Sequence, residues 1–438
     1  MPKRFAASVC GSLMFALALA FAGSALAQAP APAAAPQPAP AFDAVAATEA
    51  YLARMTPEQR ERSDAYFEGG YWLELWVFLY GLAVALLLLA TGLSARLRDL
   101  ARRLGRKKPL ETALYWVFYL PIVSLLSFPL TLYSEYFREH HYGLATQGFG
   151  SWLGDQGKNF ALDLLIGALF LPLLYGIFRK LPRSWPLWGG TASVVLLMFI
   201  ALVGPVFINP IFNEYKPLAD EKVKAPILAL ARANGIPVTE VYQMDASRQT
   251  TRVSANVSGL LGTERITLND NLLERASLPA IEAVMAHEMG HYVLNHVYEL
   301  VLELGLLIVA GFAFVYRGMD WALARWGARW RLEGVSDVAS LPLLVAVFAV
   351  FFFVMTPVTN TIIRVNEVEA DLFGLNAAGQ PDGFAEAALM LGEYRKMSPG
   401  PLEEFLFFDH PSGRNRILMS MRWKAEHLAA PPAVPSAP

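Results

Sequence analysis

The stretch that decides the fold reads SLPLLVAVFAVFFFVMTPV at positions 340–358. It holds no charged side chain and has the roughly 20-residue length that a helix needs to cross a bilayer core. Five more apolar runs precede it, at 71–93, 114–133, 160–178, 187–208 and 300–316. The last of these is short enough to be a helix buried among its neighbours instead. With 55% apolar and 17% charged residues, the chain has the composition of a polytopic membrane protein.

Two stretches are not membrane-like. In 209–299, a helical pattern is followed by three short runs rich in β-branched residues, at 239–245, 252–257 and 265–269. These runs and the turns between them predict a small antiparallel β-sheet. The stretch from 359 onward is predicted to be helical and to end in a loose Ala/Pro tail. One domain is therefore expected to be interrupted by a helical hairpin, formed by the fifth and sixth apolar runs.

The N-terminus is typical of a secretory signal peptide. A short basic start and an apolar core precede Ala25-Leu26-Ala27, which has the small residues of a cleavage site. An uncleaved membrane anchor is the alternative. The Ala/Pro-rich tract that follows, from Gln28 to about Phe42, predicts a flexible or polyproline-like tether. A short polar helix is expected after it, near 56–66. The single cysteine, Cys10, lies in the signal segment, so a cleaved chain has neither disulfides nor a thiolate nucleophile.

The motif HEMGH occupies 287–291, in a helix that is predicted to begin at Ser277. Histidines four residues apart share a helix face, so His287 and His291 can reach one metal ion. Glu288 is offset by about 100°, which lets its carboxylate approach water on the open side of the metal. The motif predicts a Zn²⁺ site with Glu288 as the general base. The alternative is a helix whose histidines only hydrogen-bond to nearby groups.

A zinc peptidase needs a third protein ligand. Metzincins have a glycine three residues and a histidine six residues after the second histidine. Leu294 and Val297 stand there, so that class is excluded. His296 is one position out of register, and we expect it at the surface or an interface.

The third ligand is predicted in the segment NEVEAD at 366–371. Glu367 and Asp371 are four apart and share a helix face, whereas Glu369 points about 200° away from Glu367. We therefore expect Glu367 to bind the metal and Asp371 to orient a ligating histidine. Glu369 is expected to be solvated or salt-bridged.

HEMGH, a membrane hairpin and then EVEAD together resemble the integral-membrane CAAX prenyl endopeptidase family of gluzincins, with its HExxH and ExxAD motifs. Further stretches carry the same resemblance: NPIFN at 209–213, DASR at 245–248, RITLND at 265–270, and DHPS at 409–412 followed by Arg416 and Ile417. The resemblance implies a mainly α fold: a polytopic helical membrane protein with a zincin-like catalytic domain, which contains the small sheet.

The same resemblance implies roles for individual residues. It brings His410 to the site as a stabiliser of the oxyanion or a substrate contact, and it makes Arg416 a substrate-binding residue. The family usually has Asn-Ala-Tyr before the glycine that aligns with Gly259, whereas this chain has Ser254-Ala255-Asn256. Ser254 is in strict register with the substrate-holding asparagine. Asn256 lies two positions on, on the same strand face, so both are candidate substrate contacts.

The predicted function is zinc-dependent endopeptidase activity on membrane-associated or secreted polypeptides. CAAX-type prenyl-peptide proteolysis and an inactive zinc-binding scaffold are the alternatives, and a transporter or receptor with an incidental HExxH motif is the rival class. The expected partners are a polypeptide substrate and the lipid bilayer. No basic stripe interleaved with aromatic residues is present, so no nucleic-acid partner is expected.

The charges flanking the apolar runs predict the orientation. The connections after the first, third and fifth runs are basic, whereas the one after the second run is not. The positive-inside rule then places the basic connections in the cytoplasm. We therefore expect a multi-pass protein of the bacterial inner membrane with the site on the periplasmic side. The basic residues are Arg96, Arg98, Arg102, Arg103, Arg106, Lys107, Lys108, Arg179, Lys180, Arg183, Arg317, Arg325, Arg329 and Arg331.

The sequence thus predicts seven segments along the chain. They are a signal peptide (1–27), a tether with a short helix (28–70), a four-helix membrane region (71–208), a first catalytic part (209–299), a transmembrane hairpin (300–358), a second catalytic part (359–425) and a flexible tail (426–438).

Overall fold

The structure, a computed structural model, describes residues 42–259 and 264–428. Six helical segments are long and apolar enough to cross a bilayer, and each coincides with a predicted run. The fifth is 31 residues long and only 17% of its apolar window is buried, so it is not a short core helix. The six segments are Pro57–Ala90, Lys108–His141, Phe149–Lys180, Trp185–Ile211, His296–Trp326 and Val338–Ala378. The predicted signal peptide lies outside the described residues.

The first spanning helix begins earlier than predicted. Helix α3 (Pro57–Ala90) joins the expected polar helix and the first apolar run, because a capping box of Thr56 and Gln59 starts it and no proline follows Pro57 within it. Helix α2 (Ala44–Leu52) precedes it and packs against the C-terminal helices. Its Tyr51 hydroxyl donates to Asp382 at 2.8 Å. The predicted Ala/Pro-rich tether, from Gln28 to about Phe42, lies almost entirely outside the described residues, and the helix that follows it is docked.

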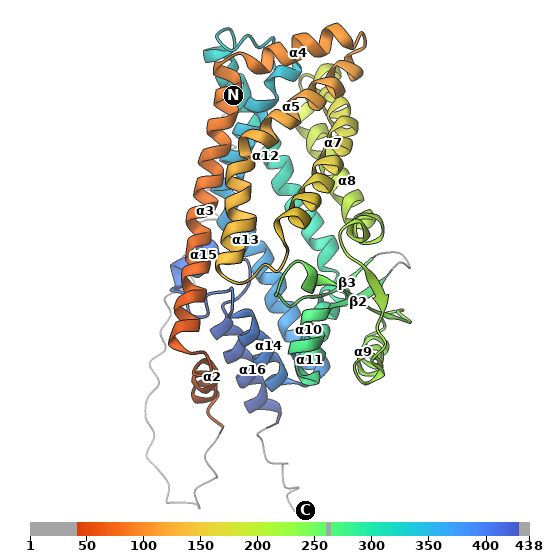
Figure 1. Ribbon diagram of the computed structural model, residues 1–438, viewed down its shortest axis with the longest axis vertical. Helices are drawn as coiled ribbons and strands as arrows, with labels where there is room; N and C mark the ends of the chain where they lie inside the picture. The colour runs from red at the N-terminus through yellow and green to blue at the C-terminus, as the bar shows by residue number, and fades with distance from the viewer. Residues whose placement is uncertain (1–41, 260–263, 429–438) are drawn as a thin grey trace, which may run out of the picture. The chain divides into compact units, whose positions relative to one another are not determined.

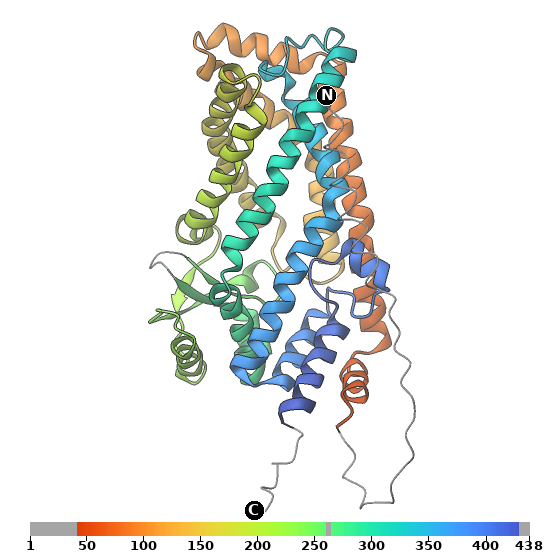
Figure 2. The same cartoon turned by 180° about the vertical axis from the view of Figure 1, so that it is seen from behind.

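The membrane region comprises α3, α5 (Lys108–Thr131), α7 (Phe149–Lys180) and α8 (Trp185–Val203), together with two later helices. These later helices are α12 (His296–Trp326) and α13 (Leu341–Ala378), which pack against each other and run side by side in both views (Figures 1 and 2). Apolar side chains from all six helices form one core. This core includes Leu88, Tyr115, Tyr175, Phe312 and Leu344.

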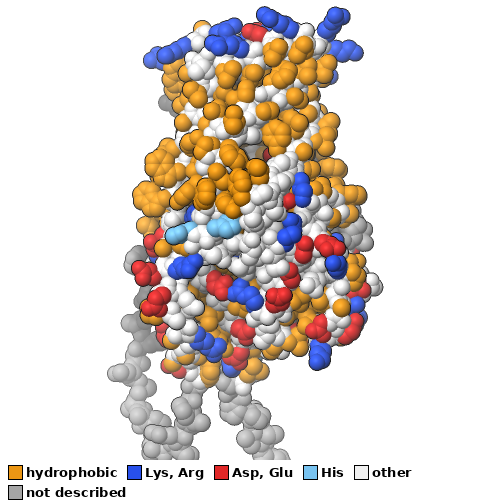
Figure 3. All heavy atoms as spheres, in the orientation of Figure 1, with side chains coloured by type: hydrophobic (Ala, Val, Ile, Leu, Met, Phe, Trp, Pro, Cys, Tyr) orange, Lys and Arg blue, Asp and Glu red, His pale blue; other side chains and the backbone are white. Residues whose placement is uncertain are grey.

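Basic residues gather at one end of the spanning helices. There, the amphipathic helix α4 (Leu93–Leu104) contacts the α12–α13 connection. The buried Arg98 guanidinium pairs with Asp337 at 2.6 Å, and Arg102 pairs with Glu333 at 2.9 Å. Figure 3 shows Lys and Arg side chains at this end, apolar side chains below them, and mixed charges over the other half. The small β-sheet and the helix that carries the HEMGH motif lie at the opposite end from α4 (Figure 1).

The small sheet has four strands in the order β1-β2-β4-β3. They are β1 (Tyr215–Pro217), β2 (Val241–Met244), β3 (Ala255–Ser258) and β4 (Arg265–Asn269). β1–β2 and β3–β4 pair antiparallel, but β2–β4 pair parallel. The prediction of an antiparallel sheet was therefore wrong for the central pair. The physical reason is burial: β4 carries the fully buried Ile266 and Leu268 and takes a central place, which leaves the half-exposed β3 at the edge.

Six further helices complete this end of the molecule, and the first three of them contact the sheet. They are α9 (Glu221–Ala233), α10 (Asp270–Arg275), α11 (Leu278–Val293), α14 (Pro381–Leu391), α15 (Pro401–Phe407) and α16 (Gly413–His427). The long helix α13 crosses the boundary predicted at 358, so one continuous helix carries both the last apolar run and the NEVEAD segment.

Candidate metal centre

Helix α11 carries the HEMGH motif and has two differently used faces. As predicted, it begins at the cap Ser277, whose side chain accepts from the backbone N–H of Ala280. Met285 and Met289, four residues apart, are fully buried against the sheet and α9. His287 and His291 are displaced by two residues from these methionines and therefore face α13. The apolar face thus anchors the helix to the sheet, and the opposite face presents two imidazoles.

Helices α11 and α13 approach closely because the contact has little side-chain bulk. A Cβ at Gly374 would lie 2.9 Å from the backbone nitrogen of His287. A Cβ at Gly290 would lie 3.2 Å from the Cα of Ala370. Glycine at both positions, with alanine at 370, therefore lets the backbones meet. This contact brings Glu367 opposite the two histidines.

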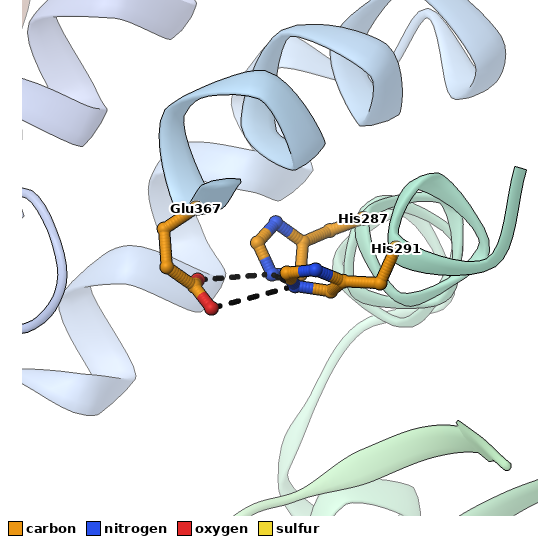
Figure 4. A group of neighbouring side chains, drawn as sticks. All are labelled: His287, His291 and Glu367. Carbon is orange, nitrogen blue, oxygen red and sulfur yellow. Dashed lines mark hydrogen bonds and ion pairs between the residues drawn. The ribbon is translucent and has the colours of Figure 1, made fainter. Parts of the chain in front are cut away.

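Three side chains converge where the helices meet (Figure 4). His287 Nε2 and His291 Nε2 are 3.2 Å apart. Glu367 Oε2 is 3.3 Å from His287 Nε2, and its Oε1 is 3.4 Å from His291 Nε2. Two ligands about 2.05 Å from a tetrahedral ion would be about 3.3 Å apart, so the spacing fits a first-row metal. Glu367 Oε2 is also buried without a hydrogen-bond partner among the described residues, as a metal-binding atom would be.

The electrostatics of His287 also favour a cation at this point. Burial alone lowers the pKa of His287, but Asp371 and Glu367 outweigh it and raise that pKa to about 10. Without a metal, a proton therefore holds the carboxylates and the imidazole together. A metal ion must displace this proton in order to bind.

Asp371 is fully buried behind His287. One of its oxygens lies 2.7 Å from His287 Nδ1, a short contact that is not aligned as a hydrogen bond. The buried Arg416 donates through Nε to the other oxygen at 2.9 Å and through a terminal nitrogen to the first. The predicted neighbourhood of Asp371 and His287 is therefore present. Arg416, predicted as a substrate contact, is engaged with Asp371, and its substrate role stays a prediction.

His410 lies at the site, as predicted. Its Nε2 is 3.2 Å from Glu367 Oε2, and its Nδ1 is 2.8 Å from Asp409 Oδ1. Asp409 therefore fixes the orientation of the ring. Sequence reasoning did not assign Asp409 a role, although its position directly before His410 was the available indication.

Glu288 faces a cavity of about 290 Å³ beside the three converging side chains. Burial raises the pKa of its carboxyl, and the neighbouring imidazoles oppose this rise. Ser254 lines the same cavity, but Asn256 does not. Of the three candidate substrate contacts, Ser254 and Arg416 therefore lie at the cavity and Asn256 does not. The other lining residues include Leu272, Val284, Phe384, Leu391, Tyr394, Arg395 and His410, of which Tyr394 and Arg395 were not anticipated.

The prediction for His296 was wrong. Its side chain is only 1% exposed, and it lies against His291 instead of at the surface. Glu369 is 53% exposed, in agreement with the expected solvated carboxylate, and it lies 3.3 Å from His296 Nε2. The sequence spacing misled because His296 does not continue helix α11: Asn295 adopts a left-handed conformation (φ 62°) and a new helix starts at His296.

The fold and the site together define a membrane metalloprotease. Residues 217–421 match the model of peptidase family M48, and residues 44–214 match the model of the CAAX prenyl protease N-terminal region, described as five membrane helices. The chain belongs to the membrane CAAX protease family. Its six candidate spans make it a multi-pass membrane protein.

Relatives in bacteria and yeast are similar over most of the chain. An uncharacterized metalloprotease, YhfN of Bacillus subtilis, is 29% identical over 75% of this chain and 78% of its own length. The CAAX prenyl protease 1 of Saccharomyces cerevisiae is 29% identical over 67% of this chain and 68% of its own. The crystal structure of S. mikatae Ste24p superposes with a TM-score of 0.72 at 22% identity, covering 86% of this chain and 95% of that one. This last match supports the fold.

Proposed function

We propose that the protein is a zinc-dependent endopeptidase of the gluzincin type. His287, His291 and Glu367 would hold the ion. The observation that carries the proposal is the convergence of two imidazole nitrogens and a carboxylate, 3.2–3.4 Å apart, beside Glu288 in one cavity. Two nitrogen ligands and one oxygen ligand suit Zn²⁺ and leave a position open.

The residues around that open position would each have a separate role in peptide hydrolysis. The metal, when bound, supplies Lewis-acid activation of water and of the scissile carbonyl. Glu288 accepts the proton that the attacking water gives up and returns it to the leaving amine. Burial raises the pKa of Glu288, which makes its carboxylate a stronger base for this proton transfer. His410, oriented by Asp409, directs Nε2 toward the site, where it stabilises the developing oxyanion.

Helices α13 and α16 supply the support for the ligands. Asp371 orients His287 through Nδ1, and Arg416 neutralises and fixes the buried Asp371 carboxylate. Arg416 would therefore act on the metal ligands through Asp371. Its place in the cavity lining also leaves it in reach of a substrate.

The substrate is proposed to be an extended polypeptide. Strand β3 is an edge strand, and Ser254 and Ala255 at its beginning line the cavity. An extended peptide can add to such an edge through backbone hydrogen bonds and so present its scissile bond to the site. The apolar side chains in the cavity wall, such as Leu272, Val284 and Phe384, and the adjacent spanning helices favour membrane-associated or secreted polypeptides. The yeast relative's name points to prenylated peptides, which the substrate experiment below would detect.

We place the site on the periplasmic side of a bacterial inner membrane. The basic residues gather around α4 and the α12–α13 connection, at the end of the spanning helices opposite α11 (Figures 1 and 3). The positive-inside rule assigns that end to the cytoplasm. Alkaline phosphatase fused after Pro381 should be active. An inactive phosphatase, with a fluorescent protein folding at the same point, would reverse the orientation.

Substrate trapping tests the function. Glu288→Gln keeps all three ligands and removes the base, so it should bind zinc while its peptidase activity falls at least about 100-fold. Substrates that stay bound to this variant can then be identified by mass spectrometry. Glu282→Gln is the matched control, because Glu282 lies on the same helix and accepts from Gln380, outside the cavity lining. Full activity of Glu288→Gln would refute the proposal. Prenylated peptides among the trapped products would favour the CAAX-type alternative.

A further inference from the structure

His291, unlike His287, has no carboxylate contact at Nδ1 among the described residues; its neighbour there is a third histidine. His291 Nδ1 lies 2.9 Å from His296 Nδ1, and the two ring centroids are 5.0 Å apart. His296 is 1% exposed and is held there by the left-handed turn at Asn295. On the far side, His296 Nε2 lies 3.3 Å from Glu369 Oε2. The three side chains form a line from the surface to the proposed metal.

Only one assignment of donors and acceptors is possible along His291, His296 and Glu369 when both rings are neutral. If His291 uses Nε2 as the ligand, the single proton of its neutral ring is on Nδ1. That proton can be donated only to an unprotonated His296 Nδ1. The proton of His296 is then on Nε2, where it points at the Glu369 carboxylate. Each donor in the chain therefore faces one acceptor, with both rings neutral.

We propose that His296 is a positioning residue, which accepts the Nδ1 proton of His291 and thereby fixes the tautomer and ring orientation of that ligand. Glu369 completes the chain by selecting the tautomer of His296. The inference rests on the proposed metal-binding function. It gives the two histidine ligands different support: His287 is held by a buried carboxylate and His291 by a neutral imidazole.

The same residues also raise a competing interpretation, a second metal site. Ligand atoms of His296, Glu299 and Glu369 lie within 4.8 Å of one another. A cation on His296 Nε2 would, however, move the proton of that ring to Nδ1. It would then face the Nδ1 proton of His291 at 2.9 Å, donor against donor. Metal binding at such a second site would therefore weaken metal binding at the first. The positions of the protons favour the hydrogen-bond chain instead.

Two substitutions separate hydrogen bonding from packing. His296→Asn places an amide oxygen near the position of Nδ1 and preserves the acceptor. His296→Leu fills a similar volume without one. The full-length protein in detergent would be titrated with Zn²⁺ against a chelator, and its Co²⁺-substituted form would be recorded by visible absorption. We expect His296→Leu to weaken zinc affinity about 10–100-fold and to alter the Co²⁺ spectrum. His296→Asn should remain within about threefold of the parent protein in affinity.

The outcomes distinguish the alternatives. Wild-type affinity in His296→Leu, or equal losses in both variants, would overturn the inference, because the acceptor would then not matter. A second tightly bound equivalent of zinc that disappears in His296→Leu would assign His296 to a metal site instead. Thermal unfolding of the metal-free variants shows whether either is misfolded. If the parent protein binds zinc but cleaves no peptide, the proposed function fails while the affinity comparison still decides the role of His296.

Discussion

Replacing Asp371 with asparagine tests how the site is held together. Asp371 is fully buried between His287 Nδ1 and the Arg416 guanidinium, both of which need an acceptor. A carboxylate accepts on both oxygens, but an amide offers one acceptor and turns a donor toward one partner. Arg416, itself buried, also loses its paired charge. Loss of a buried ionic partner costs about 3–5 kcal/mol, and the remaining amide acceptor should keep the effect near the lower figure.

The metal affinity should fall separately from the stability. Loss of the group that orients a ligating histidine typically weakens affinity about 10–100-fold, which corresponds to about 1.4–2.8 kcal/mol. Chelator competition measures the affinity, and thermal unfolding of the metal-free protein measures the stability. Glu214→Gln is the control, because its side chain is 63% exposed and its ion pair with Lys216 contributes little. Unchanged zinc affinity with lower stability would make Asp371 only the counter-ion of Arg416 and refute the orienting role.

Four other results are expected. Glu367→Ala should lose most zinc in a chelator assay, whereas Glu369→Ala should lose no more affinity than His296→Leu, because Glu369 acts only through His296; the reverse would overturn the ligand assignment. Gly374→Ala should separate α11 from α13 and weaken zinc binding at least about tenfold. Gly176→Ala is the control, because a Cβ added there has no neighbouring atom within 4 Å. Equal zinc affinities in the two variants would refute the close-approach argument. Asp337→Ala should destabilise the protein by about 3–5 kcal/mol in thermal unfolding, because it leaves the buried Arg98 without its partner. Activity per folded molecule should not fall, because this ion pair lies far from the metal site. Unchanged thermal unfolding would show that the ion pair contributes little. Zinc affinity should rise about tenfold per pH unit between pH 6 and 8. The raised pKa of His287 keeps this side chain protonated over that range, and zinc must displace the proton in order to bind. A zinc affinity that does not change with pH would contradict this.

The local sequence pattern was sufficient to predict the membrane helices and the metal-binding motif. Hydrocarbon thickness sets the length of a spanning helix, so each apolar run predicted a helix that the structure contains. The 3.6-residue repeat likewise placed His287 and His291 on one face and Glu367 and Asp371 on another. These relations depend only on residues within a few positions of each other. They can therefore be read without knowing how the chain folds.

Relations between distant segments were less accessible. The parallel pairing of β2 with β4 depends on which strand is most buried, and burial is a property of the packed domain. The docking of α2 depends on a partner surface at Asp382, over 300 positions away. The sequence pattern therefore predicted neither α2 nor the surface against which it packs.

The sequence alone determined the membrane class, the pair of histidines and the candidates for the third ligand. Only the tertiary structure decided that Glu367 reaches both histidines, because two glycine-permitted contacts let α11 and α13 approach closely. It also decided the place of His296, which a single left-handed residue turns back onto His291. Side-chain periodicity extends along one helix and ends where the helix ends. Contacts across a helix break or between helices are set by packing, and packing involves the whole chain.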